Sequence, residues 1–179
     1  MIVNETKNDL QTNLAATENL AGKQARLLMF VCAAAILCCG VLVLLLDLFL
    51  SEEEPDYIFP IVTFVLAALC FVFAIAYRAI LRSILKRSMQ GKEGVNTYTF
   101  TEDGYEVSTF LNDGTTGKTQ GGYNAFTAVK EYRDMWLLSL NKATVFIVAK
   151  DGMREGTAEE LTALLVNKCQ SRYKVCYKK

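Results

Sequence analysis

The residues most suggestive of chemistry are Gly117, Lys118 and Thr119, because Gly-Lys-Thr ends the phosphate-binding loop of many nucleotide-binding proteins. That loop also needs a glycine five positions before its Gly-Lys pair, where this chain has Asn112, and a helix directly after it. The residues that follow, GGYNAFTAVKEY, have the pattern of a strand. The segment therefore indicates the polar second strand of a hairpin and not a nucleotide site.

No other group of residues indicates catalysis or metal binding. The chain contains no histidine, so neither a Ser-His-Asp nor a Cys-His site can form, and its six cysteines lack metal-binding spacing. The carboxylate pairs Glu102-Asp103 and Glu159-Glu160 stand in a turn and at a helix start, where solvation and the helix dipole account for acids. We therefore expect no enzymatic activity, no metal and no cofactor.

Two long apolar segments are expected to determine where the rest of the chain lies. Residues 27–46 and 58–77 carry no charge, and each is long enough, at ~1.5 Å per residue, to cross a hydrocarbon core of roughly 30 Å. Buried helices of a soluble bundle would show a polar stripe, and a cleaved signal peptide would begin earlier. We predict transmembrane helices at residues 27–50 and 58–77.

The charges around these spans predict their orientation. Lys23 and Arg26 precede the first span, a basic cluster follows the second, and the intervening residues 51–57 are acidic. Because bases near span ends are retained in the cytoplasm, we expect a cell-membrane protein with two spans and both termini cytoplasmic. Residues 1–26 would then be a cytoplasmic segment with a frayed helix, and residues 51–57 a short extracytoplasmic turn.

The basic cluster after the second span is the one candidate binding site. Arg78, Arg82 and Lys86 recur every four residues, so they share one face of a helix, and Arg87 follows directly. Each base at headgroup level gains about 1 kcal/mol from anionic lipid. We predict a basic amphipathic juxtamembrane helix and linker at residues 78–94, with these four side chains at the membrane interface.

From Val95 the pattern changes to short alternating runs, which predicts a separate domain at residues 95–179. Strands are expected at TYTFT, YEVSTFL, TTGKTQ, TAVKEY, MWLLSL and TVFIVA, and Trp136 in the fifth is expected in the core. Thr157 and Glu160 form a capping box that begins one C-terminal helix. Such an antiparallel sheet closed by one helix predicts a small pleckstrin-homology-like barrel, so the fold class is membrane α with cytoplasmic α+β.

Three segments carry a resemblance to a known family. They are YTFTEDGYEV at 98–107, YNAFTAVKEYRDMWLLSL at 123–140, and FIVAKDGM at 146–153 followed by the helix TAEELTALL. With the two preceding spans, they resemble YcxB-like proteins, a group of small bacterial membrane proteins. The resemblance implies a C-terminal YcxB-like domain, but no activity and no functional residue.

These features favour a non-enzymatic membrane protein that tethers a cytoplasmic interaction or sensing module. The alternative is an accessory subunit or regulator of a transporter or membrane enzyme that contacts its partner through the spans. From Glu93 onward acids and bases are equal in number, so we expect a protein partner and no nucleic acid. Small residues in the spans would also allow a homo-oligomer. We further expect a fragment from Val95 to fold alone.

Overall fold

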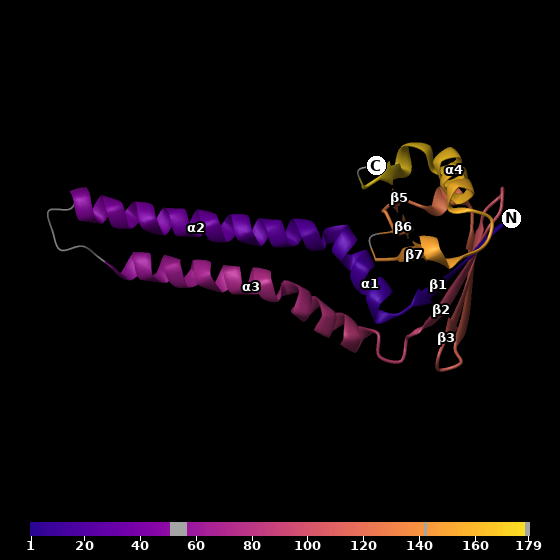
Figure 1. Cartoon of the computed structure of the whole chain (residues 1–179), viewed down its shortest axis with the longest axis horizontal. Helices are drawn as coiled ribbons and strands as arrows, with labels where there is room; N and C mark the ends of the chain where they lie inside the picture. The colour runs from indigo at the N-terminus through magenta and orange to yellow at the C-terminus, as the bar shows by residue number, and fades with distance from the viewer. Residues whose placement is uncertain (51–56, 142, 178–179) are drawn as a thin grey trace. The chain divides into compact units, whose positions relative to one another are not determined.

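The chain folds into two compact units, and one of them is discontinuous in sequence. The computed structural model describes residues 1–50, 57–141 and 143–177, without the side chains of residues 21–23, 47 and 50. One unit, which we call the sheet unit, comprises Met1–Asn19 and Ile84–Lys179; the other, the helical hairpin, is Leu20–Ser83 (Figure 1). The hairpin is therefore inserted between two parts of the sheet unit.

The helical hairpin consists of two long antiparallel helices, α2 (Lys23–Leu50) and α3 (Ile58–Ser88) (Figure 1). They lie close together at Gly40, where a β-carbon would collide with the hydroxyl of Thr63. The rings of Phe30 and Phe71 pack edge to face with centroids 5.5 Å apart. The two long helices thus lie in the predicted places. α3 continues without a break from the second predicted span through most of the predicted juxtamembrane helix.

Both helices are long and apolar enough to cross a membrane, over Gln24–Leu46 and Ile58–Ser88. Only 11% of the most apolar window of the first and 17% of that of the second are buried. Helices in the core of a soluble protein would be mostly buried. The apolar surface of the hairpin must therefore be covered by something outside the described residues of this chain.

The first sheet has the order β4-β3-β2-β1-β8, with all neighbours antiparallel. Its strands are β1 (Ile2–Asn8), β2 (Gly94–Phe100), β3 (Tyr105–Leu111), β4 (Thr116–Gly121) and β8 (Met153–Glu155). The prediction of a frayed helix at the start of the chain is wrong for β1, which has a partner strand on each side. A helix, α1 (Leu10–Thr17), and a π-helical turn, Glu18–Gly22, follow β1.

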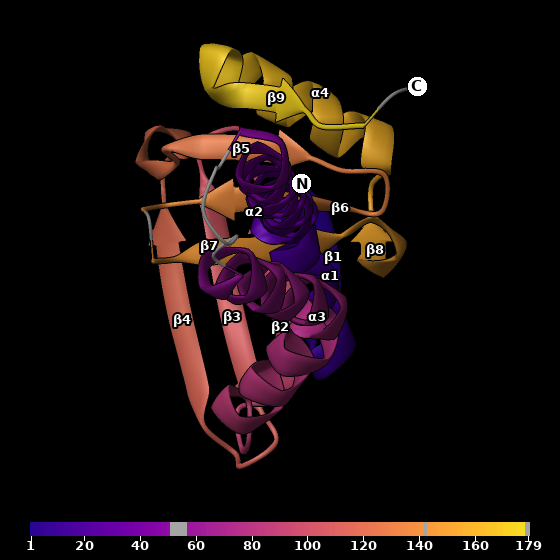
Figure 2. The same cartoon turned by 90° about the vertical axis from the view of Figure 1, so that its left-hand side faces the viewer.

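The second sheet has the order β7-β6-β5-β9 and lies across the first (Figure 2). Its strands are β5 (Ala128–Glu131), β6 (Met135–Ser139), β7 (Val145–Ala149) and β9 (Tyr173–Val175), and β9 runs parallel to β5. The predicted barrel is wrong, because the described strands form two open sheets. Short 3-10 helices at Tyr123–Ala125, Lys150–Gly152 and Gln170–Arg172 connect neighbouring elements.

One core lies between the two sheets and the C-terminal helix α4 (Ala158–Cys169). The predicted capping box is confirmed, since the Thr157 hydroxyl accepts from the Glu160 main-chain N–H and the Glu160 carboxylate accepts from that of Thr157. Trp136 is fully buried in this core, as predicted. The predicted domain, residues 95–179, is only part of the sheet unit, which also contains β1, α1 and the end of α3.

Candidate functional site

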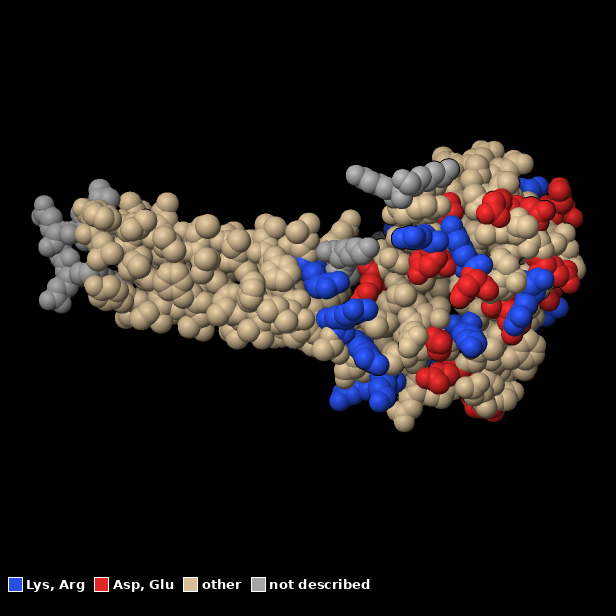
Figure 3. All heavy atoms as spheres, viewed as in Figure 1, with Lys and Arg blue, Asp and Glu red and all other residues tan. Residues whose placement is uncertain are grey.

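The four predicted membrane-interface side chains all lie exposed on the last turns of α3. Arg78, Arg82 and Lys86 are spaced four residues apart on the helix, and Arg87 follows Lys86. Among the described side chains of α2, only Arg26 is charged. On the face seen in Figure 3, the apolar helices are tan along most of their length and blue only at one end. The exposed bases therefore lie where the apolar stretch of α3 ends.

Some predicted features fall where the structure gives no description. The acidic segment 51–56 lies outside the described residues, as do Lys178 and Lys179, and the side chain of Lys23 is also outside them. The predicted turn between the spans and part of the charge pattern that orients them therefore remain predictions.

The hairpin carries an apolar hollow of about 360 Å³ between its two helices. Alanines form its floor, and larger side chains surround them: Phe30, Ala33, Ala34, Leu37, Phe64, Ala67, Ala68 and Phe71. Ala33 and Ala67 are themselves buried. Such a surface can accept an apolar side chain or a lipid chain by close packing, since it offers no hydrogen-bonding group that would select a polar ligand.

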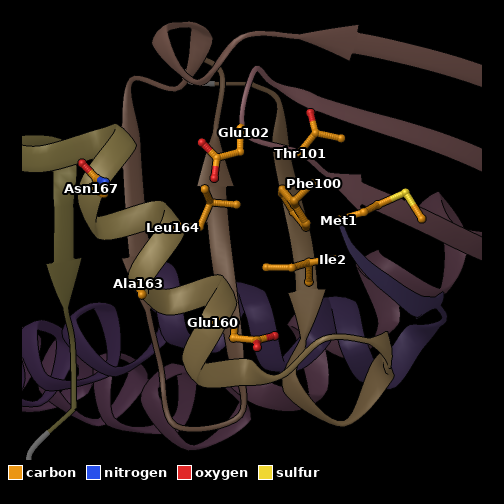
Figure 4. Close-up of a pocket in the computed structure, with 9 residues that line it drawn as sticks. All are labelled: Met1, Ile2, Phe100, Thr101, Glu102, Glu160, Ala163, Leu164 and Asn167. Carbon is orange, nitrogen blue, oxygen red and sulfur yellow. The ribbon is translucent and has the colours of Figure 1, made fainter.

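A second hollow, of about 370 Å³, lies between α4 and the end of the β2–β3 hairpin (Figure 4). Ile2, Phe100 and Leu164 give it apolar walls, and Glu102 and Glu160 give it an acidic rim. The Glu160 carboxylate already accepts from the Thr157 main-chain N–H at 2.9 Å, because it completes the capping box. Glu160 therefore caps α4 whether or not a ligand binds in this hollow.

The most concentrated polar cluster of the sheet unit surrounds Glu131, at the end of β5. This carboxylate is buried and accepts from Lys150 Nζ at 2.5 Å, from Tyr173 OH at 2.5 Å and from Tyr177 OH at 2.9 Å. The Lys150 ammonium also lies 4.9 Å from the centre of the Trp136 ring and 5.1 Å from that of Tyr177. The cluster joins β5, β6 and the C-terminal strand β9.

The electrostatics of this cluster are those of a satisfied ion pair. Burial alone would raise the pKa of the Glu131 carboxyl, but its three donors and the charge of Lys150 outweigh burial and hold that pKa below its ordinary value of 4.5. Burial, the hydrogen bond to Glu131 and its charge raise the pKa of Tyr173, so this phenol remains a donor. Glu131 is therefore charged at neutral pH and is poorly suited to serve as a general acid.

Both chain segments that lead into the helical hairpin are fixed to the sheet unit. The Asn8 side chain donates to the Lys92 carbonyl oxygen at 2.9 Å and accepts from the Asn13 side chain at 2.8 Å. Tyr132 OH donates to the Asn19 carbonyl oxygen at 2.8 Å. Burial, together with the nearby Cys176, raises the pKa of Tyr132 to about 12, so this hydrogen bond persists throughout the physiological pH range.

Sequence reasoning excluded a phosphate loop at Gly117–Thr119, and the structure agrees, because these residues lie within β4 and no helix follows them directly. In the part of the chain that the structure describes, no three side chains of metal-binding type converge. Sequence reasoning missed the Glu131 cluster, whose members come from segments far apart in the chain. One local signal existed: Val129 and Glu131 are two residues apart in a strand, which places both on the same side of β5, and both are buried while their neighbours are partly exposed.

Comparison with known proteins identifies part of the sheet unit. The model of the family described as YcxB-like protein matches residues 100–165. The match runs from the last residue of β2 through most of α4, so it leaves out β1, β9 and the helical hairpin. No curated protein and no solved structure is significantly similar to the chain.

Proposed function

Because the chain contains a YcxB-like domain at residues 100–165, we propose that it is a non-enzymatic cell-membrane protein that holds a cytoplasmic interaction or sensing module at the membrane surface. The observation that carries this proposal is the antiparallel pairing of β1 with β2, from Ile2↔Phe100 to Asn8↔Gly94. These strands flank the hairpin in sequence, so both of its ends must lie on the same side of any membrane it enters.

The dimensions and surface of the hairpin support membrane insertion. Its candidate spans are 23 and 31 residues long, which corresponds to about 35 Å and about 46 Å, compared with a hydrocarbon core of roughly 30 Å. Large apolar side chains point outward on both helices, including Phe49 at 81% exposure and Ile58 at 73%. Exposure of this apolar surface to water is unfavourable, and contact with lipid chains removes that free-energy cost.

The exposed bases on α3 favour the cytoplasmic side for the sheet unit. Bases are retained on that side during insertion, and the inner leaflet is rich in anionic lipid. Arg78, Arg82, Lys86 and Arg87 would then contact phosphate-bearing headgroups, and the sheet unit would lie in the cytoplasm.

We propose a protein as the partner of the sheet unit. Recognition of a phosphorylated lipid headgroup needs several converging bases. The β2–β3 hairpin carries Glu102, Asp103 and Glu106 and has no base. An acidic hairpin on a surface of balanced charge gives no long-range attraction to anionic lipid or nucleic acid.

Reporter fusions in the native membrane test the proposal. A reporter that works only in the cytoplasm should be active when it is fused after Lys179. A reporter that works only after export should be active when it is inserted within residues 51–56. Extraction of the full chain by alkaline carbonate, or an exported signal at Lys179, would contradict the proposal.

The apolar hollow on the hairpin supports a second candidate, an accessory subunit or regulator that binds a transporter or membrane enzyme through its helices. The two candidates differ in which unit binds the partner. Crosslinking in membranes that requires the sheet unit supports the first candidate. Crosslinking that persists with the hairpin alone and is weakened by Ala67→Leu, which fills the hollow, supports the second.

A further inference from the structure

The free edge of β4 is the longest open strand edge in the described part of the sheet unit. β4 pairs only with β3, and its residues are exposed except for Gly121, which is partly buried. The edge strands β8 and β9 span only three residues each. The remaining edge strand, β7, is approached by β1, whose Thr6 hydroxyl accepts from the Ala149 main-chain N–H at 2.9 Å.

The usual devices that protect a strand edge are missing from β4. Natural edges are blocked by proline, by a bulge or by charges that point into the approaching strand. β4 has no proline, and its register with β3 runs without a shift from Tyr105↔Gly121 to Phe110↔Thr116. Its single charge, Lys118, is bound to Glu106 of the neighbouring strand at 2.8 Å. The main chain of β4 is therefore open to another strand.

The hydrogen-bond pattern of the hairpin determines which groups face that edge. Leu111 N–H donates to the Thr115 carbonyl oxygen at 2.9 Å, next to the turn. Hydrogen-bonded and non-hydrogen-bonded pairs alternate from there in an antiparallel ladder. Every second residue of β4 therefore directs its main-chain N–H and C=O to the free edge, and these residues are Thr116, Lys118 and Gln120.

We propose that β4 pairs antiparallel with β4 of a second copy of the chain, with the two-fold axis at Thr119. The segment GKTQG at 117–121 is nearly symmetric about this residue. In this register Lys118 faces Gln120 of the partner subunit, and Gly117 faces Gly121 of the partner subunit. Thr119 faces itself across the axis, and threonine pairs are favourable at such positions.

The neighbouring registers are less favourable. Centring the pair on Lys118 places two ammonium groups directly opposite each other, which destabilises a strand pair. Centring it on Gln120 still brings the edge-facing main-chain groups of the two strands together, but fewer residues overlap at the Thr116 end. The register at Thr119 thus gives the longest overlap that has no like-charge pair.

The inference rests on the proposed membrane anchoring for its affinity. One pair of edge strands buries less surface than the roughly 1,200 Å² of a stable interface. Confining both copies to one membrane raises their effective concentration, so that a weak contact becomes populated. The occupant we infer is therefore another copy of this chain in the same membrane.

Disulfide trapping of the full chain in membranes tests the register. In the proposed register the two Thr119 residues form a non-hydrogen-bonded pair, whose Cα atoms lie about 4.5 Å apart. This distance is within disulfide reach, so Thr119→Cys should form a covalent dimer under mild oxidation. Thr116→Cys is the matched control on the same strand, because its two copies would be about 20 Å apart. The unsubstituted chain, with its exposed Cys176, gives the background.

A charge substitution separates loss of pairing from loss of folding. Gln120→Lys, added to Thr119→Cys, should lower the yield of covalent dimer about tenfold, because two like-charge pairs then face each other across the edge. Within one chain the new base lies opposite Glu106, so folding should not weaken, which the fluorescence of Trp136 will show. Adding Lys118→Glu restores opposite charges and should restore the dimer.

Each outcome decides one question. If Thr119→Cys does not crosslink in carbonate-resistant membranes, or if Thr116→Cys crosslinks equally well, the β4 pairing is wrong and the membrane proposal stands. If carbonate extracts the chain, the membrane proposal is wrong, and the pairing loses the confinement on which it depends.

Discussion

The side chain of Asn4 donates to the main-chain carbonyl oxygen of Ala149 at 2.7 Å, although the two residues are 145 positions apart in sequence. Ala149 also donates its N–H to the Thr6 hydroxyl at 2.9 Å, and that hydroxyl donates to Asn4 Oδ1 at 2.7 Å. Two buried side chains of β1 thus satisfy both main-chain groups of one residue in β7. This contact joins the two sheets through the segment that precedes the hairpin.

Replacing Asn4 by alanine should lower the free energy of unfolding by about 2 kcal/mol, because it leaves the partly buried Ala149 carbonyl without its donor and the buried Thr6 hydroxyl without its acceptor. Trp136 is the only tryptophan in the chain and is fully buried in the sheet unit. Its fluorescence during urea unfolding of the full chain in detergent measures the effect. Asn8→Ala is the control and should cost less, because water can replace its exposed hydrogen bond to Lys92 and reach its partly buried one from Asn13. Equal losses would contradict the role of Asn4.

A fragment of residues 95–179 should not fold, which revises our expectation from sequence. It lacks β1, which lies between β2 and β8 and also contacts β7. Residues 1–19 joined to residues 84–179 by a flexible linker contain all of the sheet unit and should fold. Circular dichroism and urea unfolding of the two fragments make the comparison. A cooperative transition in the shorter fragment would show that β1 is dispensable.

Stability of the sheet unit should fall in acid because of Glu131. Its pKa is held below 4.5 in the folded state, so folding favours the charged form. The stabilisation is fully present above pH 4.5 and is lost as pH falls through the lower, folded-state pKa. Glu131→Gln should remove this part of the pH dependence.

Lys150→Met should cost about 3 kcal/mol at pH 7, because it leaves a buried carboxylate without its cation. Urea unfolding followed by Trp136 fluorescence at several pH values measures the effects of both substitutions. If the free energy of unfolding of Glu131→Gln falls in acid as steeply as that of the unsubstituted chain, the assignment of the pH dependence to this carboxylate is contradicted.

The bases on α3 should act through charge and not through a specific shape. Replacing Arg78, Arg82 and Arg87 by lysine should leave membrane insertion and orientation unchanged, because lysine keeps each charge. Replacing these three and Lys86 by glutamine should scramble the orientation of the hairpin. The reporter after Lys179 measures both outcomes, and the same behaviour in the two variants would contradict the charge mechanism.

The elements that sequence predicted well have strong local signals. β3 matches its predicted range, Tyr105–Leu111, because its first four residues alternate between buried and less buried positions and turns bound it on both sides. α4 begins at its capping box as expected. The two long helices followed from hydropathy and length alone.

The elements that were missed depend on contacts between distant segments. β1 turns Asn4 and Thr6 inward, so polar residues occupy the positions where alternation should show apolar ones. β9 is only three residues long and lies in a basic tail, and its parallel pairing with β5 has no local signature. The barrel was wrong because local patterns identify strands but do not show where a sheet divides in two.

The insertion of the hairpin between β1 and β2 also has a consequence for biosynthesis. Asn8 leaves the ribosome 86 residues before its partner Gly94. At about 5–20 residues per second, β1 therefore waits on the order of ten seconds for its first neighbouring strand, while the hairpin enters the membrane. A hairpin that inserts with its ends on opposite sides can never bring these strands together. The unpaired β1 would then expose every wrongly oriented molecule to the proteases that clear unfolded chains.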